Sequence, residues 1–187
     1  VIYCPFSIPV TNPMRVVESA ELHHFWADLH GQSEETIGTN SARKYFEFAR
    51  DLAFLDATGH QGNDFQITNA FWSKLNTLNA QFNEKDRFIT LPGYEWSGNT
   101  HLGGDRNVYF TSEGGQIRRS SHALVPDKSD IHTDATTAGE LFQAFEEHGE
   151  DVICFAHCGG RYADVKLAHN GRFERSMEIH SSWGTFE

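Results

Sequence analysis

The chain is poor in cysteine, poor in basic residues and free of long apolar runs, and each shortage narrows what it can be. Its three cysteines, Cys4, Cys154 and Cys158, form no C-x-x-C pair and leave an odd number, so we expect free thiols. No stretch approaches the ~18 apolar residues of a membrane-spanning helix. The first residues also lack the basic start and apolar core of a secretion signal. We therefore expect no membrane association, while a cytoplasmic and a periplasmic location both stay open.

The shortage of positive charge excludes another class of partner. Lys and Arg number 15 against 26 Asp and Glu, for a formal net charge of −11. Nucleic acids and anionic membranes bind clusters of basic residues, so neither is an expected partner. A small anionic substrate remains compatible with this acidity, because bound metal ions supply the local positive charge that the chain lacks.

What the chain has in excess is histidine, with eleven among its 187 residues. Histidine is a common ligand of transition metals, so this number favours a metal site without locating it. The length is enough for one core and calls for no second domain. We expect an extended lead-in over residues 1–22, where Pro5, Pro9 and Pro13 disfavour a helix, and a single domain over residues 23–187.

Strand and helix patterns alternate along this domain. Apolar runs predict strands over residues 24–30, 54–60, 87–94, 107–111, 152–156 and 177–179, and apolar spacing predicts helices over residues 41–55, 68–82 and 137–149. A long polar stretch, residues 112–136, suggests a lid. The alternation predicts an α/β protein with a mostly parallel sheet, either open or closed as a barrel. Polar clusters at the strand ends favour the barrel.

The first candidate ligands follow the first two predicted strands. Asp28, His30 and Gln32 are two positions apart, so their side chains share one face of a strand. The amide oxygen of Gln32 can bind a hard cation only weakly. His60 ends the next strand before a polar turn. The alternative is structural: a buried aspartate bonded to a histidine, and a histidine that caps a strand.

The segment LPGYEWSGNTHLGGDRN is the most informative. Glu95 follows an apolar strand between aromatic residues, and a carboxylate there needs compensation, which a metal ion provides. His101, Asp105 and Arg106 follow in a glycine-rich loop, as a candidate ligand, base and anion clamp. Solvation at the surface is the competing interpretation of these three residues.

Two late segments add further candidates. His157 closes the apolar strand VICFA and meets two glycines, which suits a metal ligand. Glu178 and His180 share a strand face beside Ser181 and Ser182. A serine nucleophile is conceivable there, although the G-x-S-x-G elbow is absent. The remaining histidines are expected at the solvated surface: His23, His24, His122, His132, His148 and His169.

Taken together, the pieces DLHGQS, GHQGNDF, GYEWSGNTHLGGDRN, FAHCGGRYAD and MEIHSSWGTFE resemble the PHP (polymerase and histidinol phosphatase) superfamily. The resemblance implies a distorted TIM-like (β/α)7 barrel, incomplete here because the family's late D-x-H motif is missing before residue 187. It also implies two or three Zn, Mn or Fe ions and phosphoester hydrolysis. The metal ligands it implies are His30, Gln32, His60, Glu95 as the bridging carboxylate, and His157.

The sequence thus predicts a divalent-metal-dependent hydrolase, a phosphoesterase that uses a metal-activated water. Asp105, His101 or His180 would assist proton transfer, and Arg106 or Arg161 would hold the anion of a small substrate. An unfinished barrel would also favour self-association. Three alternatives stay open: a hydrolase of C–N or other ester bonds, a metal-binding module without catalysis, and a structural fragment whose histidines satisfy core hydrogen bonds.

Overall fold

The computed structural model describes residues 18–19 and 21–186, and its regular structure begins at β1 (Ala27–Gly31). Most of the lead-in expected over residues 1–22 lies outside the described residues. β1 pairs in parallel with β2 (Ala57–His60), which pairs in parallel with β3 (Ile89–Leu91). Parallel neighbours need a crossover connection, and a helix fills each one here.

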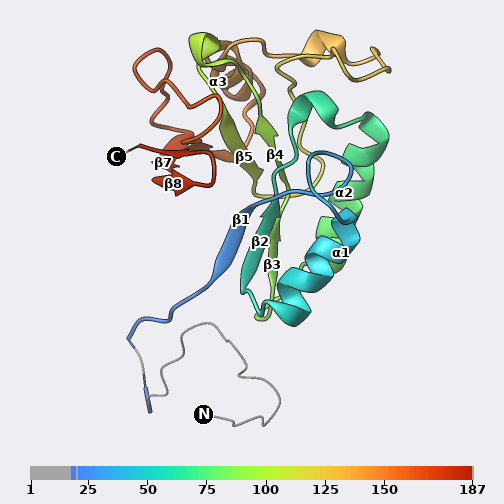
Figure 1. The fold of residues 1–187 in the computed structure, drawn as a ribbon, viewed down its shortest axis with the longest axis vertical. Coiled ribbons are helices and arrows are strands. Elements are labelled where there is room, and N and C mark those ends of the chain that lie inside the picture. The colour runs from blue at the N-terminus through green and yellow to red at the C-terminus, as the bar shows by residue number, and fades with distance from the viewer. Residues whose placement is uncertain (1–17, 20, 187) are drawn as a thin grey trace.

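The two crossover helices begin where the sequence predicts them. α1 (Ala42–Glu47) is capped by Ser41 and continues as a π-helical turn, Phe48–Leu52. α2 (Asn69–Phe82) is capped by Thr68, whose hydroxyl accepts a hydrogen bond from the Phe71 amide. Both helices lie on the same side of the β1–β2–β3 sheet (Figure 1). The apolar faces of both helices pack into one hydrophobic core. The large side chains of this core include Phe46, Leu75, Phe82, Tyr94, Trp96 and Phe145.

A second sheet follows directly from the first. Pro92 splits the strand predicted over residues 87–94 into β3 and β4 (Gly93–Trp96), because proline has no amide hydrogen for the ladder. β4 pairs with β5 (Arg106–Phe110), β5 with β6 (Val152–Ala156), and β6 with β7 (Glu174–Met177). The final strands, β8 (His180–Ser181) and β9 (Gly184–Thr185), form a separate hairpin.

The predicted (β/α)7 barrel is wrong. The described residues form a small α/β fold with sheets of three, four and two strands, and none of them closes. β5 runs antiparallel to both β4 and β6. Its connection to β4 contains only the 3₁₀ turn Thr100–Leu102, which is too short for the crossover that a parallel neighbour requires.

The polar stretch before α3 (Ala138–His148) is anchored to the body of the protein. Arg119 is fully buried and donates to the Ile67 carbonyl and to Asp130. His122, expected at the surface, is also buried, with its Nδ1 2.6 Å from Oδ2 of Asp134 and its Nε2 3.0 Å from Oδ1 of Asp130. α3 itself begins with a capping box of Thr137 and Glu140, at the start of the helix predicted over residues 137–149. Among the described helices, none has the length and apolar character needed to cross a membrane.

Candidate metal centre

One edge of the sheets gathers most of the polar side chains. β1, β2 and β3 run in the same direction, and β4 continues β3. Glu95 in β4 forms a single parallel bridge with Asn63, which follows β2. β6 and β7 are parallel to each other, and β6 is antiparallel to β5, as β4 is. The ends of β1, β4, β6 and β7 therefore meet the start of β5 at one edge. This topology collects side chains from distant parts of the chain.

Glu178, just after β7, lies at the centre of one group of side chains. Its Oε1 is 2.7 Å from Nδ1 of His30 and 2.6 Å from Nδ2 of Asn107. Its Oε2 accepts a hydrogen bond from Nδ1 of His157. The rings of the two histidines lie 4.7 Å apart, edge to face. Glu178 therefore orients both imidazoles toward one point.

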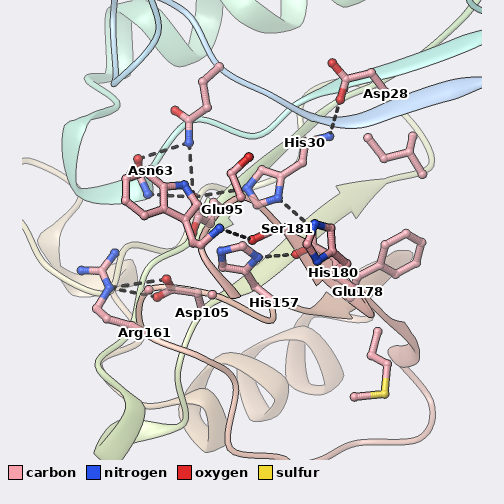
Figure 2. Close-up of a pocket in the computed structure, with 18 of the residues that line it drawn as sticks. Asp28, His30, Asn63, Glu95, Asp105, His157, Arg161, Glu178, His180 and Ser181 are labelled. Atoms are coloured by element: carbon pink, nitrogen blue, oxygen red, sulfur yellow. Dashed lines mark hydrogen bonds and ion pairs between the residues drawn. The ribbon is translucent and has the colours of Figure 1, made fainter. Parts of the chain in front are cut away.

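Glu95, Asp105 and His157 form a second group that shares His157 with the first. Oε2 of Glu95 accepts a hydrogen bond of 2.7 Å from Asn63 and one of 3.3 Å from Gln32, and lies 3.5 Å from Nε2 of His30. In each group the ligand atoms all lie within 4.8 Å of one another. Figure 2 shows the side chains of both groups pointing toward a common space.

Arg161 is the only lysine or arginine among the described residues that line this space. Its Nε lies 3.1 Å from Oδ1 of Asp105, and its guanidinium lies 5.3 Å from the ring centre of Phe65. Burial and then the charge of Glu95 raise the pKa of Asp105 to about 8, against the lowering effect of Arg161. The negative charges of Asp105 and Glu95 therefore repel each other, and Arg161 alone does not offset this repulsion and the cost of burial.

The electrostatics of the first group favour an ion pair. Burial alone would lower the pKa of His30, but its hydrogen bonds to Glu178 and Glu95 outweigh burial and raise that pKa to about 10. Burial would raise the pKa of Glu178, yet the hydrogen bonds from His157 and His30 bring it down to about 2. A proton on His30 thus occupies the place that a cation would take.

The two groups line a cavity of about 760 Å³. This volume is typical of small-molecule sites in proteins. The structure brings six of the predicted site residues to its wall: His30, Gln32, Glu95, Asp105, His157 and His180. Arg161, the second arginine considered for the substrate anion, is there as well. The long stretch expected to act as a lid contributes no described residue to the lining.

His60 does not join this group. It is fully buried between the rings of Tyr45 and Phe71. The amide of Gly62 donates to its Nδ1 at 3.3 Å, and its Nε2 lies 2.8 Å from Oγ of Ser33. Both ring nitrogens are engaged, and burial lowers the pKa of His60 to about 4. His60 is therefore a neutral core residue, as in the structural alternative.

Arg106 and His101 are also away from the cavity. Arg106 is fully buried, where its Nε donates to Glu174 at 2.9 Å and its other nitrogens donate to the carbonyls of Gly103, Gly104 and Ala168. A side chain so engaged cannot clamp a substrate anion. His101 is exposed in the turn between β4 and β5.

Sequence reasoning left out Asn107 and Asn63, and it named Glu178 only as a neighbour of His180, without a role in metal binding. Glu178 follows a strand as His157 does, and its place one strand away from His157 was the available signal. Asn107 pairs in register with Glu95 across β4 and β5, which only the antiparallel order reveals. Asn63 lies in the turn after His60, where the histidine drew attention instead.

The residues fit a divalent cation. Imidazole and carboxylate are the donors that Zn, Mn and Fe accept. Two buried oxygens at the edge of the groups, Oδ1 of Asp105 and Oδ1 of Asn107, accept no hydrogen bond. Buried acceptors are normally satisfied, so the ion pair with Arg161 leaves capacity at Asp105 that a cation would use.

Comparison with known proteins gives a family but no activity. The chain is 28% identical over 186 residues to an uncharacterized protein of Chlamydia pneumoniae, a match that covers 95% of this chain and 27% of that protein. Uncharacterized proteins of Chlamydia muridarum and of Chlamydia trachomatis serovar D are each 23% identical over 181 residues, 94% of this chain and 27% of theirs. The chain thus spans about a quarter of the length of these relatives.

The family model that matches is described as a protein of unknown function, DUF3604, and it covers residues 9–164. Assignment to the PHP superfamily is therefore wrong: the match is to a different family model, and the sheets are open and mixed where a barrel was expected. Similar sets of site residues recur on unrelated folds, so short motifs alone do not establish a fold or a family. The chain belongs to the DUF3604 family.

Proposed function

We propose that this protein is a divalent-metal-dependent hydrolase of small anionic esters, with phosphoesters as the preferred class. The observation that supports the proposal best is the convergence of five ligand-type side chains on one cavity, in two groups that share His157. These side chains come from five separate segments of the chain, and a structural role alone does not require that convergence.

His30, His157 and Glu178 would hold one ion, and Glu95 and Asp105 would hold a second ion together with His157. Ions bound there would lower the pKa of a coordinated water and neutralise charge on the bond that breaks. Asn107 and Asn63 position the ligands, because their amides donate to Glu178 and Glu95. Loss of a hydrogen bond that holds a metal ligand in place typically weakens metal binding by about 10- to 100-fold.

Arg161 would hold the substrate anion. It lines the cavity, and its guanidinium is fixed by Asp105 and by the ring of Phe65. A planar guanidinium binds two oxygens of a phosphoryl group at once. Water would form a bond to phosphorus while the bond from phosphorus to the leaving oxygen breaks. His180, exposed at the cavity wall and in no ion pair among the described residues, would give its proton to that leaving oxygen.

Metal analysis and a substrate panel test this proposal. Protein purified without chelators is expected to retain Zn, Mn or Fe, and loaded protein is expected to hydrolyse 4-nitrophenyl phosphate faster than 4-nitrophenyl acetate or an anilide. Glu95→Gln should remove both metal and turnover, while Glu113→Gln at an exposed position should change neither. Hydrolysis of the anilide alone would show that the enzyme cleaves C–N bonds instead of phosphoesters. Metal retention without any turnover would contradict the hydrolase.

A further inference from the structure

The cavity has an apolar wall that metal binding and anion binding leave unexplained. Its lining includes Ile37, Phe155, Met177 and Trp183. Ile37 is 57% exposed and Trp183 is 72% exposed. A single exposed apolar residue is ordinary, but several that line the same cavity as charged ligands are typical of a binding site.

The position of Trp183 is fixed by its backbone. It lies in the turn of the β8–β9 hairpin, where its amide donates to Oγ of Ser181 at 3.0 Å. The hairpin packs on the residues that follow His157: a Cβ on Gly159 would lie 2.4 Å from Cβ of Trp183, so only glycine permits this contact. Sγ of Cys158 also lies 3.5 Å from the Gly184 carbonyl. The hairpin therefore holds Trp183 next to a candidate metal ligand.

The indole of Trp183 lies apart from the other aromatic rings that the structure describes. Within the described part of the chain, no ring contact involves Trp183, whereas several aromatic residues of the core pack in pairs, such as Trp72 with Tyr94. An indole face has a strong preference for flat apolar groups, and tryptophan loses little conformational entropy when it binds one. An anchored and otherwise unused indole beside the candidate ligands is thus suited to contact the organic part of a substrate.

We infer that Trp183 is the specificity-determining residue for that organic part, and that the site selects anionic esters with an aromatic group over alkyl esters. This inference rests on the proposed function for the position of the anion at Arg161. Ile37 and Phe155 add apolar contact to the same group. The ring of the substrate packs on the indole, while its anionic group faces the ligands and Arg161.

Two phosphonates test the inference, because neither can be hydrolysed and they differ only in the ring. Calorimetry on the full chain, with and without added Zn, is expected to show phenylphosphonate binding at least about fivefold more tightly than methylphosphonate. Trp183→Ala should bring this ratio close to one and leave methylphosphonate affinity unchanged. Trp183→Phe should keep most of the preference. Trp26→Ala, at a 40% exposed indole outside the cavity, is the matched control and should keep all of it.

A ratio near one in protein that binds Zn would overturn the inference, and so would a preference that survives in Trp183→Ala. Failure to bind either phosphonate in Zn-loaded protein would also overturn it. A different result would contradict the proposed hydrolase function: absence of Zn binding or of turnover, with a preference for phenylphosphonate that still depends on Trp183. The two proposals are therefore judged by separate measurements.

Discussion

Nδ1 of His30 lies 2.7 Å from Oε1 of Glu178, although 148 positions separate the two residues in the chain. The same carboxylate also accepts a hydrogen bond from His157, so one side chain connects the ends of β1, β6 and β7. A carboxylate that orients two imidazoles is either a ligand itself or the group that fixes the ligands. Its removal should therefore affect metal binding more than it affects the fold.

We expect Glu178→Gln to weaken metal binding by about 10- to 100-fold, because the neutral amide neither balances a cation nor holds both imidazoles. Competition titration against a chromogenic chelator measures this affinity. Glu84→Gln makes the same chemical change at an exposed surface ion pair with Arg87 and should leave affinity unaltered. Equal affinities for the wild type and Glu178→Gln would remove Glu178 from the site.

Metal affinity should rise with pH. The pKa of His30 is raised to about 10, so the imidazole carries a proton at neutral pH that a cation must displace. At pH values below this raised pKa, each displaced proton should increase log affinity by about one per pH unit. Titrations at several pH values give this slope, and calorimetry in buffers of different ionisation enthalpy counts the protons. A flat profile would show that His30 is no ligand.

His60 should make the protein sensitive to acid. Its pKa is lowered to about 4 by burial, so as the pH falls from ~6.5 to 4 the unfolded chain binds a proton that the folded state excludes. This group then lowers the free energy of unfolding, by an amount on the order of 3 kcal/mol across the window. In His60→Gln that contribution is absent, and its stability gap to the wild type should narrow toward pH 4.

Urea denaturation at pH 7 and at pH 4.5 measures the gap. His132→Gln, at an exposed position, should follow the wild type at both pH values. A gap between His60→Gln and the wild type that stays constant with pH would show that His60 titrates normally.

Arg106 should affect stability instead of binding. Its guanidinium and the Glu174 carboxylate are both buried, so Arg106→Gln leaves that carboxylate with only the ring of His169 as a partner. This loss is expected to cost about 3–5 kcal/mol in the free energy of unfolding. Arg161→Gln, at a partly exposed side chain, should change stability little and reduce methylphosphonate affinity. Thermal denaturation and calorimetry on both variants provide the comparison. A large loss of stability in Arg161→Gln, together with a loss of methylphosphonate affinity in Arg106→Gln, would contradict both assignments.

Local structure was readable from the sequence where side-chain chemistry acts over a few residues. The helices predicted over residues 68–82 and 137–149 begin within one residue of the predicted positions, because the hydrogen bonds that cap them at Thr68 and Thr137 are local. The strand at residues 152–156 was equally clear, since five apolar residues precede His157. Candidate ligands at strand ends followed from the same patterns.

Sheet topology was not readable, because it depends on how the chain returns between strands. Nothing in residues 97–105 states that β5 will reverse direction, yet that reversal rules out a barrel and places Asn107 beside Glu95. His60 and Arg106 show a second limit. The sequence does not distinguish a side chain with buried structural partners from one that binds a ligand. Only the structure shows that Ser33 and Gly62 contact His60 and that Glu174 contacts Arg106.

The anchoring of residues 112–136 through Arg119 and His122 has a consequence for how small molecules reach the ligands. No described residue of this stretch lines the cavity, whereas residues of β1 and of the β8–β9 hairpin do, so we expect small molecules to enter beside β1 and this hairpin. The emission of a fluorophore attached within residues 112–136 should therefore not change when a ligand binds, whereas that of a fluorophore attached near residue 182 should change.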